Sequence, residues 1–469
     1  MTAQDYFSLM PFILVLSTIA LVMLTIAWQR NHKLVSFVSI SGIFSAFLTT
    51  LNTNYSSTLK LIIINSYNLM LIQGVLITSL VIIIFTFEYI KYKNQEPEEF
   101  YVLILLSILG ALVVVVSNHF VSLFLGIELL TIPLYCAIAY NFSNKNIEAA
   151  TKYIILAGLA AALMLFGMAL VYADSGAMDF ATLAYYPQSS SLFVCGMALI
   201  LVALAFKISA VPFHVWTPDV YDGAPLCTGV FLATISKGVS LIILMRIWLL
   251  LEEQAHVNLF WLMSIISILS MLGGNILALK QDNIKRLLAY SSIAHFGYLT
   301  MAMIATAGIT TQAILLYLLS YIITILIIFG VLMTLNRPVE NIAELKGLFS
   351  EQPFFALALF LGFLSLMGLP LTALFMAKFL VIMAGVKSSQ WLLISALVTS
   401  SALGIFVYIR ITNILFEKSS SQNMPKNIKP LASSVVALLA LCLLVLGLWP
   451  TPATSYIRQN NTAMLTQQD

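Results

Sequence analysis

Residues 191–225 have the sequence SLFVCGMALILVALAFKISAVPFHVWTPDVYDGAP, and this stretch indicates an interrupted membrane helix. An apolar run ends at Lys207, and the three prolines that follow it exclude one continuous helix. A single helix over residues 183–218 would measure about 54 Å, well beyond the roughly 30 Å hydrocarbon core of a bilayer. We therefore expect a broken helix, whose freed backbone groups lie within protein or beside water. The alternative is a cytoplasmic re-entrant loop from which Lys207 extends to the membrane surface.

The composition places the whole chain in a membrane. Of its 469 residues, 61% are hydrophobic and 9% are charged, whereas a soluble domain has about 25% charged residues. A net charge of +3 without a basic block argues against nucleic-acid binding. The four cysteines have no CxxC spacing and lie in apolar segments, so we interpret them as buried apolar residues rather than disulfides or metal ligands.

Fourteen apolar segments predict fourteen transmembrane helices, which places both termini on one side of the membrane. The first segment has no small-residue cleavage site after it, so we expect a retained span rather than a signal peptide. The predicted helices lie near residues 10–28, 33–50, 69–90, 100–117, 119–140, 150–173, 191–211, 225–250, 257–279, 284–306, 310–335, 353–386, 390–416 and 430–449.

The distribution of basic residues predicts the orientation of these helices. Of the 22 Lys and Arg residues, fifteen are assigned to the loops after odd-numbered helices and the helix ends beside them, three to the remaining loops and tails, and four to the spans. Basic residues are enriched in cytoplasmic loops. The loops after odd-numbered helices are therefore expected in the cytoplasm, and both termini on the periplasmic side.

A second overlong segment, residues 352–386, holds Gly368 and Pro370 near its middle and Lys378 as its only charge. We expect a second broken helix here, with Lys378 near the membrane midplane. If helices four to eight form one unit and helices nine to thirteen the next, both breaks fall in the fourth helix of a unit. Because each unit has five spans, the second unit begins on the opposite side of the membrane from the first and is therefore inverted. The predicted divisions are 1–99 for the first three helices, 100–252 and 253–417 for the two repeats, and 418–469 for the last helix and tail.

Ionisable side chains inside the spans are the candidate functional residues. Glu128 is the one carboxylate midway along a predicted span, where it costs about 2.5 to 3.5 kcal/mol on insertion scales. Such residues usually face the bundle interior and serve ion movement, and a structural salt bridge or a neutral hydrogen-bonded Glu is the alternative.

Lys237 lies halfway along the eighth span, and that helix contains no carboxylate. This pattern is typical of a proton carrier or of a lysine packed against a backbone carbonyl. Arg246, two residues from Trp248, is interpreted as an interfacial anchor.

The tenth span opens with QDNIKRLLAYSSIAHFGY at residues 281–298, where Asp282 or Asn283 can cap the helix. The enrichment of basic residues in cytoplasmic loops is enough to account for Lys285 and Arg286 in its first turn. His295 lies about 15 Å along the helix from Lys285, and an unperturbed histidine titrates near neutral pH. We interpret His295 either as a proton relay or as a packed hydrogen-bonding residue.

Together, Glu128, Lys207, Lys237, His295 and Lys378 form a set of ionisable groups in an otherwise apolar bundle. A carboxylate and a lysine that approach and separate change each other's proton affinity, which makes such a pair a proton switch. The five histidines show no ligand spacing, and no glycine-rich loop follows a strand. We therefore expect no metal, nucleotide, flavin, haem or iron–sulfur cluster in this chain.

Four stretches carry a family resemblance: IELLTIPLY at 127–135, LAFKISAVPFHVWTPDVYDGAP at 204–225, FLATISKG at 231–238 and QDNIKRLLAYSSIAHFGY at 281–298. The sequence resembles the antiporter-like membrane subunits of respiratory NADH:quinone oxidoreductase (complex I), most closely the subunit N branch. The likeness covers about residues 100–415. It implies an all-α fold of fourteen transmembrane helices, with two inverted five-helix repeats and discontinuous helices seven and twelve. It also implies a midplane row of charges that carries protons.

By this resemblance, Glu128 corresponds to the glutamate of the fifth helix and Lys207 to its lysine partner in the seventh. Lys237 corresponds to the central lysine of the eighth helix and Lys378 to the lysine of the twelfth. A glutamate in place of Lys378 would indicate the subunit M branch, and a long lateral helix after the last span would indicate the subunit L branch. The first three spans match the family motifs less well, and His295 is interpreted as lineage-specific.

The leading hypothesis is a proton-translocating subunit of complex I in the bacterial inner membrane, driven by quinone reduction in other subunits. The resemblance implies neighbouring antiporter-like and small membrane subunits as partners, surrounded by membrane lipids. It places NADH, FMN, the iron–sulfur clusters and quinone in those other subunits. One alternative is a subunit of a multi-subunit cation/proton antiporter, which shares these motifs. The others are an organic-solute transporter and a membrane scaffold.

Overall fold

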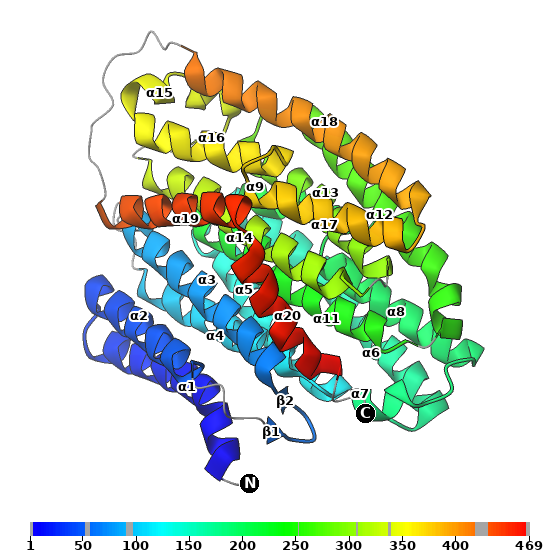
Figure 1. The fold of residues 1–469 in the computed structure, drawn as a ribbon. Helices are drawn as coiled ribbons and strands as arrows, with labels where there is room; N and C mark the ends of the chain where they lie inside the picture. Colours follow the sequence, from blue (N-terminus) through cyan, green and yellow to red (C-terminus); the bar gives the residue numbers. More distant parts are fainter. Residues whose placement is uncertain are drawn as a thin grey trace. The chain divides into compact units, whose positions relative to one another are not determined.

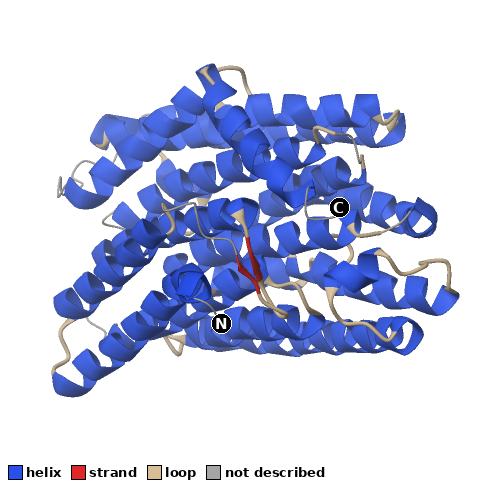
Figure 2. Cartoon of the chain, turned by 60° about the horizontal axis from the view of Figure 1, so that its bottom comes forward, coloured by secondary structure: helices blue, strands red, loops and turns tan. Residues whose placement is uncertain are grey.

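The computed structural model describes residues 3–51, 57–90, 97–251, 253–305, 308–335, 339–417 and 430–465, and within them the chain is almost entirely helical (Figure 2). The described strands form one short antiparallel hairpin of β1 (Ser57–Thr58) and β2 (Ile63–Ile64), in which Ser57 is opposite Ile64. The chain divides into two compact units. The first holds Met1–Ile208, Gly223–Phe260 and Gln459–Asp469, and the second holds Ser209–Asp222 and Trp261–Arg458.

The first unit contains the helices from α1 to α8, α10 and α11 (Figure 1). Within it, α6 and α8 approach closely at two glycines. A Cβ on Gly167 would lie 2.6 Å from the carbonyl oxygen of Gly196, and a Cβ on Gly196 would lie 2.8 Å from that of Gly167. Small residues are typical of such tight helix pairs in membranes. The elements are α1 (Ala3–Trp28), α2 (His32–Thr49), α3 (Ser66–Ile90), α4 (Glu98–Val116), α5 (Phe120–Ala139), α6 (Asn144–Ser175), α7 (Phe180–Ala184), α8 (Ser191–Lys207), α10 (Leu226–Phe231), the π-helical η1 (Leu232–Ser236) and α11 (Lys237–Leu249).

The second unit contains the helices from α13 to α19, and α9, α12 and α20 have residues in both units (Figure 1). The helices α13 and α14 are buried along nearly their whole length, so they form the centre of this unit and can carry polar side chains away from lipid. The elements are α9 (Trp216–Gly223), α12 (Glu253–Leu279), α13 (Ile284–Ile304), α14 (Thr310–Thr334), the 3₁₀ turn η2 (Ile342–Leu345), α15 (Leu348–Glu351), α16 (Pro353–Met367), α17 (Ala373–Lys387), α18 (Trp391–Phe416), α19 (Pro430–Leu448) and α20 (Thr451–Leu465).

Both overlong segments are interrupted where the sequence predicts. The helix α8 ends at Lys207, and residues 208–215 separate it from α9. Residues 368–372 separate α16 from α17. Gly368 ends α16 because it adopts a φ of 76°, a left-handed conformation that closes helix C-termini and that glycine takes without a steric penalty.

Twelve helices among the described residues are long and apolar enough to cross a bilayer. The other two predicted spans, near residues 191–211 and 353–386, consist of shorter helices: α8 has 17 residues, and α16 and α17 have 15 each. The chain is therefore a largely helical, multi-pass membrane protein. The count of fourteen spans, the inverted repeat, the four domains and the orientation stay predictions. Six of the basic residues behind the predicted orientation lie outside the described residues: Lys91, Lys93, Arg337, Lys418, Lys426 and Lys429.

Asn283 fixes the start of α13. Its Oδ1 accepts hydrogen bonds from the backbone N–H groups of Lys285 (2.9 Å) and Arg286 (3.1 Å), so Asn283 rather than Asp282 is the cap. Its Nδ2 donates to Asp222 Oδ1 at 2.8 Å, so the same side chain also joins α13 to α9.

Replacing Asn283 by alanine is expected to lower the free energy of unfolding by about 2 kcal/mol, because a helix cap and a hydrogen bond to a carboxylate are lost together. The matched control is Asn31→Ala at the start of α2, where the side chain caps the helix through the N–H groups of Lys33 and Leu34. Its expected loss is about 1 kcal/mol. Thermal unfolding of the purified protein in detergent measures both variants. Equal losses would contradict a double role for Asn283.

Candidate functional site

Lys207 is the last residue of α8, directly before the first break. Its side chain is 5% exposed, and among the described residues its Nζ has no hydrogen-bond partner. Glu128, half-buried in α5, is near enough to interact with Lys207 electrostatically, although the two side chains are not hydrogen-bonded. The predicted partners thus lie within electrostatic range of each other.

Lys237 follows a π-helical segment that the sequence analysis did not predict. The segment η1 lies between α10 and α11, and Lys237 is the first residue of α11. Its side chain is buried, and α11 packs against α8, which ends at Lys207. Short π segments within α-helices are rare and are frequent at functional sites. The irregular turn therefore sets the position at which the Lys237 side chain leaves the helix.

Lys378, in α17, lies against the C-terminal end of α16. Its Nζ donates to the carbonyl oxygens of Leu366 (3.2 Å) and Met367 (3.0 Å), and it lies 5.4 Å from the ring centre of Tyr298. The last carbonyls of a helix carry a partial negative charge, and an aromatic face attracts a cation. The second break therefore provides the ammonium group with partners from the backbone.

His295, in α13, is surrounded by tyrosines. Its Nδ1 lies 2.7 Å from Tyr317 Oη and its Nε2 3.5 Å from Tyr408 Oη, and its ring packs edge-on against Tyr298. Lys378 interacts with it electrostatically. His295 is thus a buried, hydrogen-bonded histidine in the neighbourhood of Lys378.

Hydroxyl groups that the sequence did not single out extend the cluster of His295 and its tyrosines. Tyr298 Oη is hydrogen-bonded to Ser400 Oγ (3.0 Å), and Tyr408 Oη to Ser291 Oγ (2.5 Å). Ser291, His295 and Tyr298 are four and three residues apart, which places them on one face of α13, and the sequence contains that signal. Their partners Ser400 and Tyr408 lie 102 and 117 residues further along the chain, where no local pattern connects them to α13.

The basic residues at the start of α13 have a structural role. Arg286 Nη1 lies 2.8 Å from Asp219 Oδ1, and Lys285 Nζ donates to the carbonyl oxygen of Asp222 at 2.6 Å. Both contacts hold α9, the helix that follows the first break, against α13. The positive-inside bias explains the charge of these residues but not the specific contacts that they make.

The five candidate residues fall into two groups. Glu128, Lys207 and Lys237 belong to the first unit, and His295 and Lys378 belong to the second. Within the parts of the chain that the structure describes, no group of three or more His, Cys, Asp or Glu residues is placed to hold a metal ion. Within each group, the side chains offer oxygen and nitrogen atoms that can take up and release protons.

Comparison with known proteins decides the family. Residues 117–404 match the family model described as "NADH:quinone oxidoreductase/Mrp antiporter, TM". The chain belongs to this family. The matched range includes all five candidate residues. Within the family, the NADH-quinone oxidoreductase subunit N of Ectopseudomonas mendocina (strain ymp) is 40% identical to this chain over 486 residues, which cover 99% of the chain and 98% of that relative.

Chains in three solved structures of membrane complexes have the same fold as this chain. A chain of respiratory complex I from Thermus thermophilus with bound aureothin has a TM-score of 0.84 and 28% identity, covering 95% of this chain and 99% of that chain. A chain of the archaeal membrane-bound sulfane sulfur reductase has a TM-score of 0.88 and 23% identity, over 98% of both chains. A chain of the Mrp complex from Dietzia sp. DQ12-45-1b has a TM-score of 0.85 and 18% identity, over 97% and 96%. The last two show likeness of fold alone.

Proposed function

We propose that this member of the family is a proton-translocating subunit of NADH:quinone oxidoreductase. Protons move along its buried charged residues, and quinone reduction in other subunits drives them. One observation carries the proposal. Three lysines among the described residues are buried, and each lies beside an irregular helix segment or contacts the end of a broken helix. Lys207 precedes the first break, Lys237 follows the π segment, and Lys378 bonds to the end of α16.

A lysine in such a place can hold or release a proton. The apolar surroundings favour the neutral form of each lysine, and at Lys378 the carbonyl oxygens of Leu366 and Met367 stabilise the ammonium form. At Lys207, the attraction of Glu128 depends on the separation of the two groups, so a movement of either side chain changes where the proton is held. At Lys378, repulsion from a protonated His295 disfavours two charges at once, so a proton that reaches one group favours release from the other.

The remaining features of the proposal are supported by the family resemblance and by the distribution of the basic residues. The chain contributes no redox centre, and NADH, FMN, iron–sulfur clusters and quinone bind to other subunits. Its partners are neighbouring antiporter-like and small membrane subunits. It lies in the bacterial inner membrane as fourteen spans in two inverted repeats, with both termini on the periplasmic side.

A subunit of a multi-subunit cation/proton antiporter is the second candidate, favoured by the family description, which includes the Mrp antiporter. Co-purification with NADH dehydrogenase activity would distinguish the two. An organic-solute transporter requires a substrate-sized pocket at the breaks. A cavity of about 350 Å³ among the described residues is lined by none of the residues of either break, so this cavity lends the transporter role no support.

The test replaces Glu128 or Lys207 by alanine in the whole complex and measures NADH-driven, quinone-linked proton uptake by membrane vesicles. We expect a reduction of at least about tenfold, since a positioned proton-transfer group typically contributes more than that. The matched controls are Glu148→Ala and Lys152→Ala, because these residues form an exposed ion pair of 2.7 Å on α6. Full proton pumping in both site variants would favour a membrane scaffold instead.

A further inference from the structure

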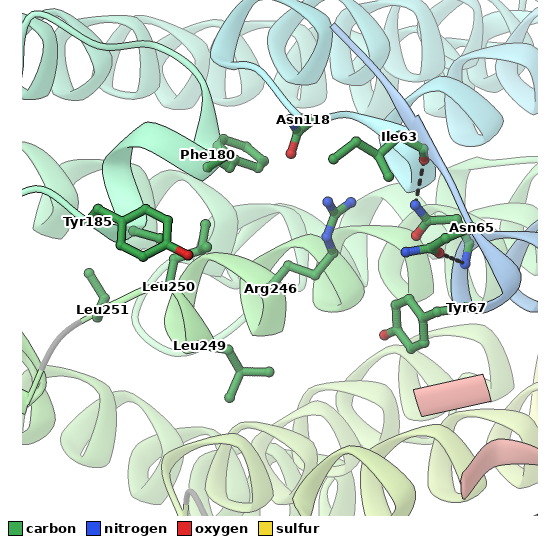
Figure 3. Close-up of a pocket in the computed structure, with 13 residues that line it drawn as sticks. Ile63, Asn65, Tyr67, Asn118, Phe180, Tyr185, Arg246, Leu249, Leu250 and Leu251 are labelled. Atoms are coloured by element: carbon green, nitrogen blue, oxygen red, sulfur yellow. Dashed lines mark hydrogen bonds between the residues drawn. The ribbon is translucent and has the colours of Figure 1, made fainter. Parts of the chain in front are cut away.

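A pocket of about 350 Å³ lies in the first unit, and none of the five candidate residues lines it (Figure 3). Its walls are the start of α3 with the residues just before it, Asn118 between α4 and α5, the short helix α7, and the end of α11. By the predicted orientation, all these segments lie on the periplasmic side, at the level of lipid headgroups.

Arg246 extends into this pocket from the last turn of α11 (Figure 3). It is the only charged residue among the described residues that line the pocket. Its Nη1 donates to the carbonyl oxygen of Val115 at 3.0 Å, and its guanidinium carbon lies 6.0 Å from the ring centre of Phe180. A guanidinium has five N–H donors in a planar fork. Within the described part of the chain one of them is used, so the others are available to a ligand.

Tyr67 and Asn118 add neutral polar groups to this site. Tyr67 is 1% exposed, its Oη has no hydrogen-bond partner among the described residues, and it interacts with Arg246 electrostatically. The Asn118 side chain also faces the pocket (Figure 3). A buried hydroxyl without a partner is destabilising, so an acceptor atom from a ligand is expected beside it.

The position of Arg246 at a helix C-terminus does not explain these contacts. A basic residue in the last turn commonly interacts with the final carbonyls of its own helix. The bond from Arg246 instead goes to Val115, the penultimate residue of α4. This contact directs the guanidinium across the pocket rather than along α11.

We propose that this pocket binds the phosphate group of a phospholipid. A guanidinium fork, a hydroxyl and an amide supply donors, no carboxylate is among the described lining residues, and phosphate accepts paired hydrogen bonds from arginine. Leu249, Leu250 and Leu251 provide an apolar wall beside these donors, which fits a lipid better than a free anion. Inorganic phosphate offers the same oxygen atoms, so the experiment must separate the two sources.

The experiment uses the whole NADH:quinone oxidoreductase that contains this chain, depleted of lipid and titrated with dioleoyl phosphatidylglycerol, with bound lipids counted by native mass spectrometry. Arg246→Gln is expected to weaken retention of one phospholipid at least about tenfold, because charged hydrogen bonds are lost. Arg410→Gln is the matched control, since Arg410 likewise donates to backbone carbonyl oxygens, those of Leu279 and Gln281. It is expected to leave the lipid count unchanged.

Two further probes identify the source of the phosphate. Dioleoylglycerol, which has the same acyl chains without phosphate, is expected not to occupy the site, and equal binding would overturn the proposal. Inorganic phosphate that occupies the pocket while phosphatidylglycerol does not would also overturn it, because the ligand would then be a free anion.

A second variant keeps the proposal testable if Arg246→Gln prevents assembly. Tyr67→Phe removes one hydroxyl donor and keeps the ring, so phospholipid retention should fall severalfold, the effect of one hydrogen bond. Unchanged retention in Tyr67→Phe together with unchanged retention in Arg246→Lys, which loses the fork, would reject the site.

Discussion

Replacing Lys237 by alanine is expected to reduce quinone-linked proton uptake by membrane vesicles at least about tenfold, because the buried lysine proposed to carry protons is removed from the start of α11. The melting temperature of the complex should not fall, because removal of a buried charge also removes its desolvation cost. Proton uptake after a pulse of NADH, recorded with a pH-sensitive dye, measures the first effect. Thermal unfolding measures the second.

The controls for Lys237 test whether its positive charge alone is needed or also its ability to release a proton. Lys280→Ala removes an exposed lysine just beyond α12 and is expected to pump normally. Lys237→Arg keeps a positive charge but holds its proton at all accessible pH values, so it should be as inactive as the alanine variant. Normal pumping by Lys237→Arg would mean that Lys237 acts as a fixed charge, and the proposed role would be wrong.

Replacing Gly368 by alanine is expected to reduce pumping about tenfold and to lower the free energy of unfolding by about 1 to 2 kcal/mol, the usual cost of a left-handed conformation for alanine. A Cβ at this position would lie 2.8 Å from Lys378 Cδ and 2.9 Å from its Nζ. The ammonium group must then move away from the carbonyl oxygens of Leu366 and Met367.

The matched control is Gly176→Ala at the end of α6. Gly176 has a φ of 67°, and a Cβ there would meet nothing within 4 Å. It should therefore show the loss of stability without the loss of pumping. If both variants pump alike after correction for the amount of assembled complex, the contact between Lys378 and the end of α16 does not matter for proton transfer.

The sequence predicted the helix breaks because their causes are local. Three prolines follow Lys207, and Gly368 and Pro370 lie in the middle of a long apolar segment, so the backbone restrictions of these residues favour an interruption there. The buried charges were equally visible, because an ionisable residue in an apolar run needs no structure to be recognised.

The surroundings of these charges could not be predicted in the same way. The partners of Lys378 are backbone oxygens, which every residue possesses, so no residue type marks them. The tyrosines around His295 come from α14 and α18 as well as α13, and their approach depends on tertiary packing. The π segment before Lys237 likewise has no established sequence signature. The sequence therefore predicted which ionisable groups lie within the helices better than it predicted what those groups touch.

The bonding of Lys378 to peptide oxygens limits how this site stores charge. A lysine paired with a carboxylate belongs to a unit in which either member can take up a proton, so the stored charge is shared. Peptide oxygens do not titrate in the physiological range, and they remain in place when the lysine becomes neutral. If Lys378 takes part in the proposed proton transfer, its ammonium group therefore alternates between one positive charge and none, and the charged form repels the next incoming cation.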